Sequence, residues 1–225
     1  MIIVSIELSL DFAENTQLRT PARAVFETFL GEVKKERRPH EPPANIRNEK
    51  EKTVIRWDYK SCNIIQEDVD DILKCISNFT NIIVTVNKVA PVGKILSKRL
   101  RVYWILPVSK YDFKNLEMKY RQMFIKDSEI FSNCTDSTVV IDMKRDEWKF
   151  SHQSGAMDVA QLQNEFRVFN IKEEQAKIFL FLATTITDEQ LEEYSRENME
   201  NFLNKSYEIC KTHSDKFEGI MEEML

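Results

Sequence analysis

The sequence predicts an α+β protein built from two ferredoxin-like (split βαβ) layers, closed by a long C-terminal amphipathic helix. Residues 1–90 show strand-like and helix-like apolar patterns in the order β-α-β-β-α-β, which is the split βαβ order. Residues 91–187 carry a looser α+β series, which makes the chain a possible degenerate tandem. Residues 188–225 are expected to form a helix that packs on both halves or on a partner.

The first half begins with a half-buried strand. From Val4 to Asp11 apolar and polar side chains alternate, as they do when one face of a strand is buried. A helix is expected behind Thr20 and Pro21, because threonine caps helices and proline suits the first helical position. Three prolines among charges of both signs predict a loop over residues 36–52.

Four more elements complete the first half. Two short apolar runs predict a strand pair over residues 53–59 and 62–66. Glu67 and Asp68 favour a helix start, because acidic side chains stabilise the positive end of the helix dipole. The β-branched run Ile82–Val89 is expected to form the last strand.

The second half mixes strands with one helix, which is expected over Leu116–Phe124. Its strands are predicted around residues 100–106, 139–143, 148–152, 166–168 and 176–183. The last of these is almost wholly apolar, so it should be a central strand that is covered on both faces.

The C-terminal segment has the strongest helical signal. Thr187 and Gln190 have the spacing of a capping box, and apolar side chains recur over residues 199–224. A helix with an apolar stripe of this length either braces the sheets or packs on a partner. The second alternative predicts a protein interface or a homo-oligomer. The residues expected to form this interface are Phe202, Ile209, His213, Phe217, Ile220 and Met224.

Composition restricts the chemistry. The chain has 4 glycines in 225 residues, where average usage would give about 16. They lie far apart, so the glycine-rich loops that cradle phosphates are absent, and so is a G-x-S-x-G nucleophile elbow. No cofactor is expected, and a non-enzymatic role is favoured.

Charge and cysteine usage point to a cytoplasmic protein with an asymmetric surface. Residues 1–130 hold 22 Lys and Arg against 18 Asp and Glu, whereas residues 131–225 hold 10 against 19. The four cysteines form no C-x-x-C pair and are expected to be reduced, as in the cytoplasm. The N-terminal strand is too short and too alternating for a signal peptide, and no apolar run could span a membrane.

Few residues have the pattern of a reactive site. His40 lies beside Arg37, Arg38 and Glu41 in the predicted loop and is the alternative candidate for a general base. The three histidines have no metal-ligand spacing, so no metal site is assigned. A metal-dependent hydrolase that uses Asp142 and Asp146 is the least favoured alternative.

A basic and aromatic constellation supports the main alternative, RNA binding. Arg99, Arg101 and Tyr103 alternate with apolar residues on one strand, so they share a face that could hold phosphates and stack bases. The residues assigned to this alternative are Lys94, Lys98, Arg99, Arg101, Tyr103, Arg56 and Trp57.

The segment from Pro91 to Ile95, followed by the strand Lys98–Ile105, resembles a sporadically distributed family of uncharacterised bacterial proteins of similar length. Val102 stands between Arg101 and Tyr103 where that family has an Arg-Leu-Arg-Tyr type strand. The resemblance implies a bacterial cytoplasmic accessory protein. Together these observations predict a non-enzymatic protein that binds another protein, with a role in a bacterial defence, immunity or toxin–antitoxin system.

Overall fold

The computed structural model describes residues 1–14, 34–35, 44–48, 52–58, 60–89, 91–124, 137–166 and 177–225. Its strands are β1 (Ile2–Phe12), β2 (Lys34–Lys35), β3 (Ala44–Asn48), β4 (Thr53–Trp57), β5 (Ser61–Glu67), β6 (Lys94–Val108), β7 (Thr138–Arg145), β8 (Trp148–Asp158), β9 (Ile178–Asp188) and β10 (Glu192–Glu193). Its helices are α2 (Ile72–Val89), α3 (Phe113–Phe124), α4 (Val159–Glu165) and α5 (Arg196–Met224).

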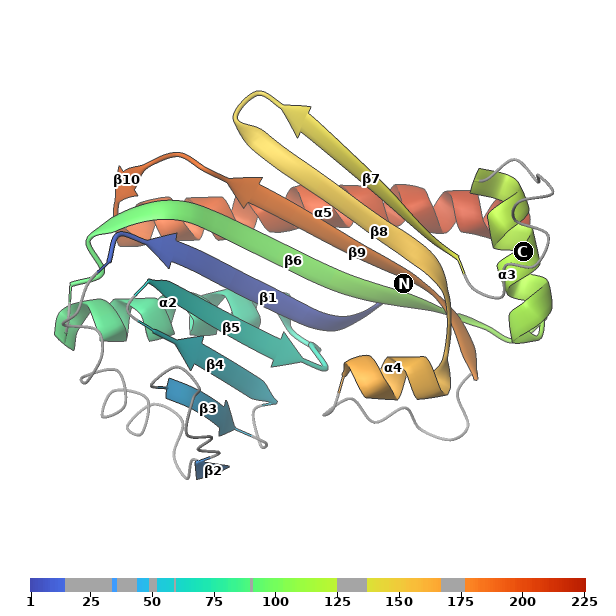
Figure 1. Ribbon diagram of the computed structural model, residues 1–225, viewed down its shortest axis with the longest axis horizontal. Helices are drawn as coiled ribbons and strands as arrows, with labels where there is room; N and C mark the ends of the chain where they lie inside the picture. Colours follow the sequence, from blue (N-terminus) through green and yellow to red (C-terminus); the bar gives the residue numbers. More distant parts are fainter. Residues whose placement is uncertain are drawn as a thin grey trace.

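Within the described ranges all ten strands join one antiparallel sheet (Figure 1). The order across the sheet is β2-β3-β4-β5-β1-β6-β9-β8-β7, and β10 pairs with one end of β6. The predicted α+β class is therefore confirmed. The long strand β6 pairs with β1 of the first half and with β9 of the second half, so strands from both halves form a continuous sheet.

One face of the sheet carries the main hydrophobic core. Leu8 and Leu10 of β1 are fully buried there, as are Leu100 of β6 and Ile186 of β9. Helices α2 and α5 cover this face, and Figure 1 shows them behind the strands. Each large apolar side chain buried in this way stabilises the fold by about 1.5–3 kcal/mol.

Helix α5 braces this core. Its Phe202, Leu203 and Cys210 are buried, and the helix contacts α2, β6 and β9. The helix begins at Arg196, because the Ser195 hydroxyl accepts a hydrogen bond from the Asn198 amide at 3.0 Å. The predicted long C-terminal helix is confirmed. None of the helices in the described part of the chain has the length and apolar composition needed to cross a membrane.

Several sequence-based element boundaries are wrong. Residues 82–89 continue α2, because Phe79, Ile83 and Val86 recur at helical spacing and bury one stripe against the sheet. Packing therefore overrides the strand preference of β-branched residues. The α2 cap is Asp71, whose carboxylate accepts the Lys74 amide at 3.0 Å.

Three further segments differ from the prediction. Part of the predicted loop forms β3, which pairs with β4. Phe166, expected in a strand, ends α4, which begins with a capping box between Asp158 and Gln161. The predicted capping box at Thr187 is not used, because Thr187 is held in the β9 ladder opposite Arg99. The helix expected behind Thr20 lies outside the described residues.

The opposite face of the sheet carries a smaller apolar cluster of described residues. Tyr103 of β6 stacks on Phe181 of β9 with ring centroids 5.5 Å apart, and Phe166 meets its edge at 4.6 Å. Helix α4 contributes the buried Leu162 to this cluster. Beyond α4 the face is mostly polar, and below it is called the open face.

Gly155 of β8 occupies a close contact between neighbouring strands. A Cβ there would lie 2.8 Å from the Ser137 carbonyl oxygen and 3.0 Å from the Phe181 ring. We therefore expect Gly155→Ala to lower the free energy of unfolding by about 1–3 kcal/mol, because backbone must move. Urea unfolding measures the change.

The matched control is Gly219, which lies exposed inside α5, where an added Cβ would have nothing within 4 Å. Gly219→Ala should raise the free energy of unfolding by about 0.5–1 kcal/mol, because alanine restricts the unfolded backbone more than glycine does. Equal effects of the two substitutions would contradict this account of Gly155.

Candidate functional site

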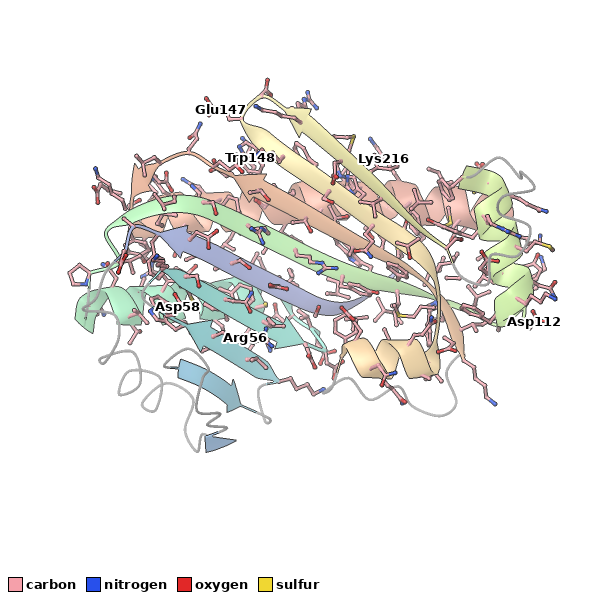
Figure 2. The ribbon with its side chains drawn as sticks, viewed as in Figure 1. Arg56, Asp58, Asp112, Glu147, Trp148 and Lys216 are labelled. Carbon is pink, nitrogen blue, oxygen red and sulfur yellow. The ribbon has the colours of Figure 1, made fainter. Side chains whose placement is uncertain are left out.

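A groove of about 1110 Å³ opens between the β7–β8 hairpin and the N-terminal part of α5. Trp148, Phe150 and Met143 line its hairpin side, and Phe202 and Ile209 line its helix side. Figure 2 labels Glu147 and Trp148 at the tip of the hairpin. Because both walls carry apolar side chains, the groove has the general character of a surface that binds an apolar ligand or chain segment.

Aromatic rings form the floor of the groove near the hairpin tip. The Trp148 and Phe202 ring centroids lie 5.9 Å apart, and the Lys205 ammonium lies 4.9 Å from the Trp148 ring. Lys98 lies 5.3 Å from the Phe202 ring on the other side. These contacts tie the hairpin to α5 through side chains that a bound molecule could also touch.

Two histidines meet deeper in the groove region. His152 of β8 and His213 of α5 have ring centroids 4.6 Å apart in an edge-to-face arrangement. His152 Nδ1 lies 3.2 Å from the Thr184 hydroxyl, whereas His213 Nδ1 is buried without a hydrogen-bond partner. Burial, followed by the His213 charge, lowers the pKa of His152 to about 4. Burial and Lys216 lower the pKa of His213.

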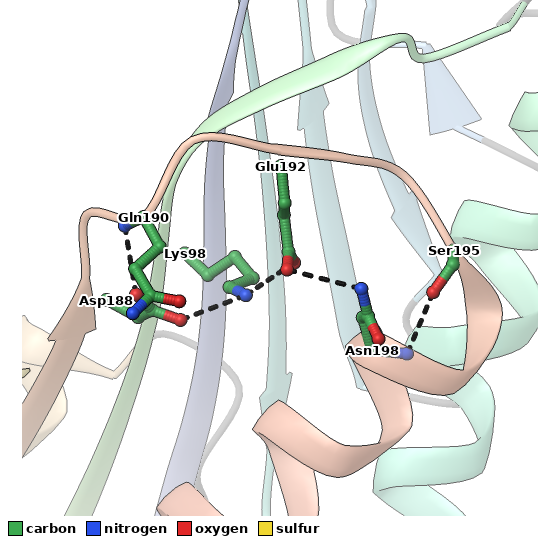
Figure 3. Close-up of polar contacts among 6 residues, drawn as sticks. All are labelled: Lys98, Asp188, Gln190, Glu192, Ser195 and Asn198. Carbon is green, nitrogen blue, oxygen red and sulfur yellow. Dashed lines mark hydrogen bonds and ion pairs between the residues drawn. The ribbon is translucent and has the colours of Figure 1, made fainter.

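A buried ion-pair cluster (Figure 3) lies at the hairpin-tip end of the groove, where Asp188 is opposite Trp148. The Lys98 ammonium lies 2.9 Å from the Asp188 carboxylate and 2.5 Å from the Glu192 carboxylate. Asn198 of α5 donates to Glu192 at 3.3 Å, and the Gln190 amide donates to Asp188 at 3.0 Å. Since Lys98 is only 3% exposed, its charge is neutralised inside the fold.

Strand β7 presents apolar side chains to solvent beside the groove. Val140 is 57% exposed, Ile141 47% and Met143 45%. Ile141 and Met143 lie opposite His152 and Phe150 of β8, so they extend the apolar wall of the groove. Val140 lies on the other face of the same strand. Adjacent apolar side chains that stay exposed on both faces of a strand mark an interaction surface.

The structure gathers part of the predicted interface at this groove. Phe202, Ile209 and His213 line it. Phe217 packs partly buried on the core clusters, as does Met224, whereas Ile220 is exposed. The sequence analysis does not predict the hairpin side of the groove. The signal that could have indicated it is the apolar run of β7, which does not alternate as a strand with one solvent face should.

The basic and aromatic residues predicted to bind RNA do not share one surface. Tyr103 is 4% exposed and Trp57 is 1% exposed, so neither ring can stack on an unpaired base. Both are buried because apolar neighbours cover them: Phe166 and Phe181 pack on Tyr103, and Phe12 packs on Trp57. Lys98 lies on the helix-covered face within its ion-pair cluster.

Arg56 and Arg99 remain exposed on the open face, and Arg101 lies half-buried there. Arg101 lies opposite Glu7 in the register of β6 with β1. Its guanidinium donates a hydrogen bond to the Gln153 side-chain oxygen at 3.5 Å. Lys94 is exposed at the start of β6, opposite Glu193 of β10. The open face therefore carries arginines without accessible aromatic partners.

One cross-strand row on the open face is basic. Arg99 lies opposite Ser9 on one side and Thr187 on the other, and the row continues to Lys149 and Lys144. In the other direction it reaches Arg56 through Asn63. At about 4.8 Å per strand, the row spans roughly 29 Å.

The described residues offer little for covalent or metal chemistry. Burial raises the pKa of the Cys75 thiol to about 12, and burial also raises those of Cys62 and Cys210, so these thiols stay protonated. No group of three or more metal-ligating side chains comes together in the described part of the chain, and Asp142 and Asp146 are exposed along the hairpin. His40 lies outside the described residues.

Comparison of the chain with protein-family models, with curated proteins and with solved structures finds no match. The functional interpretation therefore depends on the geometry of the groove and of the open face.

The histidine pair makes stability depend on pH. Both folded-state pKa values lie below the unfolded value of about 6.5, so the unfolded chain takes up protons first as the pH falls. We expect the free energy of unfolding to fall between about pH 6.5 and pH 4. His152→Gln should reduce this loss, measured by urea unfolding at neutral and acidic pH. Equal losses in both proteins would contradict the assignment.

Proposed function

We propose that this chain is a non-enzymatic protein-binding protein, and that the groove between the β7–β8 hairpin and α5 receives an apolar segment of the partner. The observation that carries this proposal is the exposed apolar wall formed by Ile141 and Met143, which continues the lining of Trp148 and Phe150. Leaving such side chains in water is unfavourable unless a partner covers them.

The composition of the groove supports recognition over turnover. His213, which lines the groove, is half-buried against His152, and Lys98 at the groove is already paired with two carboxylates. A general base needs free access to a substrate proton, which the packing of His213 against His152 restricts. The groove walls offer aromatic and aliphatic surface, which suits the side chains of a protein segment.

The finer fold assignment also remains a proposal. Strands β4, β5 and β1 of the first half and the following strand β6 take the order β4-β5-β1-β6, and β5 and β6 run parallel on either side of β1 with α2 between them in sequence. This order supports a ferredoxin-like arrangement of that half. The predicted domain boundaries after residues 90 and 187 stay predictions. So do membership of the sporadically distributed bacterial family, a cytoplasmic location and a role in defence, immunity or toxin–antitoxin systems.

Selection from a phage-displayed library of random peptides tests the groove. We expect enriched peptides to carry apolar side chains and to bind Ile209→Lys at least about tenfold more weakly than the wild type, because a charge would stand in the apolar wall. Fluorescence polarisation with labelled peptides measures the affinities. Peptides that bind both proteins equally would contradict the proposal.

The matched control is Leu73→Lys, the same type of change at a side chain that is 71% exposed at the start of α2. It should leave peptide binding unchanged. Removal of residues 199–225 would be a poor test, because it takes Phe202, Leu203 and Cys210 out of the core. The loss of binding would then reflect unfolding.

RNA binding is the second candidate function, and the basic row on the open face favours it. Lys144 lies directly opposite Lys149, a repulsive arrangement that a bound phosphate would relieve. Arg99 and Arg56 extend the row in the direction of the other half. Two features argue against RNA binding. The carboxylates of Glu7 and Asp11 flank the basic row on β1, and Lys149 already forms an ion pair with Glu189 at 2.6 Å.

Filter binding with a single-stranded RNA oligonucleotide at several salt concentrations tests this candidate. If the row holds phosphates, affinity falls steeply as salt rises, and Arg99→Gln lowers the slope by about 0.7, the contribution of one phosphate contact. Leu73→Lys is again the control, since its site lies on α2, which covers the opposite face. The absence of binding at low salt would remove the candidate.

A further inference from the structure

The outer edge of β7 is the most exposed strand edge beside the groove. Among the residues that the structure describes, β7 pairs only with β8, and it ends the strand order of the sheet on that side. All of its side chains except that of Val139 are exposed to solvent, those of Val140 and Ile141 among them. Backbone groups on such an edge can form a ladder with another strand.

We propose that β7 pairs antiparallel with β7 of a second copy of this chain, about a two-fold axis at Val140. This inference rests on the proposed protein-binding function, because it names the partner for the outer wall of the groove. A two-fold axis perpendicular to the sheet keeps each face on its own side, so a residue must lie opposite a residue of the same face.

The side chains of β7 are complementary to one another in this register. Val140 lies opposite its own copy on the open face, and Val139 lies opposite Ile141 of the second copy on the face of the groove. Thr138 lies opposite Asp142, where its hydroxyl can donate to the carboxylate. Three apolar pairs and two polar pairs result, and no like charges lie opposite one another.

Neighbouring registers are less favourable. An axis at Ile141 would place Val140 opposite the Asp142 carboxylate. An axis at Asp142 would bring two carboxylates together, which is repulsive. The axis at Val140 also places Met143 of one copy opposite Ser137 of the other. The Ser137 hydroxyl already donates to the Glu117 carboxylate of α3 at 2.9 Å, so it needs no partner from the second copy.

The pairing would join the two grooves. Strands β8 and β7 of one copy would continue into β7 and β8 of the other, and each α5 would stand as a wall at its own side. Trp148, Phe150 and Ile141 of both copies would then line one trough. A second copy therefore both covers the exposed edge and enlarges the surface that a further partner would contact.

Light scattering coupled to size-exclusion chromatography tests the proposal over a concentration series. We expect the full chain to approach twice its 26.6 kDa mass as concentration rises. Val140→Lys should keep it monomeric, because two ammonium groups would meet on the axis, whereas Leu73→Lys should dimerise as the wild type does. A wild type that is monomeric at every concentration, or a Val140→Lys protein that still dimerises, would overturn the proposal.

Disulfide formation tests the register. Under oxidation, Val140→Cys should give a covalent dimer on a non-reducing gel, because the introduced thiols lie side by side on the axis. Lys144→Cys is the matched control on the same face of β7. In the proposed dimer the two introduced cysteines of this control would lie eight residues apart along the strands, which is about 27 Å. They should therefore not cross-link. Cross-linking of the control in preference to Val140→Cys would overturn the register.

The two proposals can fail separately. A monomeric wild type whose groove still binds selected peptides, with loss in Ile209→Lys, would overturn the dimer and leave the proposed function standing. A dimer that Val140→Lys disrupts, with no peptide dependent on Ile209, would support the dimer and contradict groove binding. Circular dichroism of each variant identifies any that is unfolded, and the Leu73→Lys control carries the same charge change.

Discussion

The backbone ladder on both edges of β6 is the constraint on which the rest of the structure depends. This strand pairs along β1 on one edge and along β9 on the other, and it is the only described strand that links the two halves directly. Because the ladder fixes both registers, it also fixes which side chains of the two halves share a face. Leu8 of β1, Leu100 of β6 and Ile186 of β9 thereby lie side by side on one apolar surface, which α2 and α5 cover.

Burial on one face leaves two surfaces with different chemistry. On the helix-covered face, α5 packs over β6 and β9 and contacts β8 through the rings of Phe202 and His213, so the groove opens between α5 and the β7–β8 hairpin. The open face lacks an equivalent helix over β1 and β6 among the described residues, and its side chains there include hydroxyls, amides and charges of both signs. The difference between an apolar groove and a polar sheet favours protein recognition at the groove.

Polar groups near the groove are costly to bury, and their partners explain their positions. Lys98 is tolerated inside the fold because Asp188 and Glu192 neutralise it, which links β6, β9 and the segment before α5. His152 and His213 are tolerated because burial keeps them neutral near pH 7. These groups hold α5 against the sheet at the place where the groove begins.

The α+β class, most strands and the long C-terminal helix could be predicted from the sequence, because each leaves a local period of two or 3.6 residues. Period alone failed at residues 82–89, where strand-forming residues join α2, since packing of Val86 and its neighbours on the sheet outweighs local preference. Strand order was decided only by the tertiary structure. That order buries Trp57 and Tyr103, brings His152 to His213 and places β7 at an edge. These are contacts between residues far apart in the chain, and no local pattern encodes them.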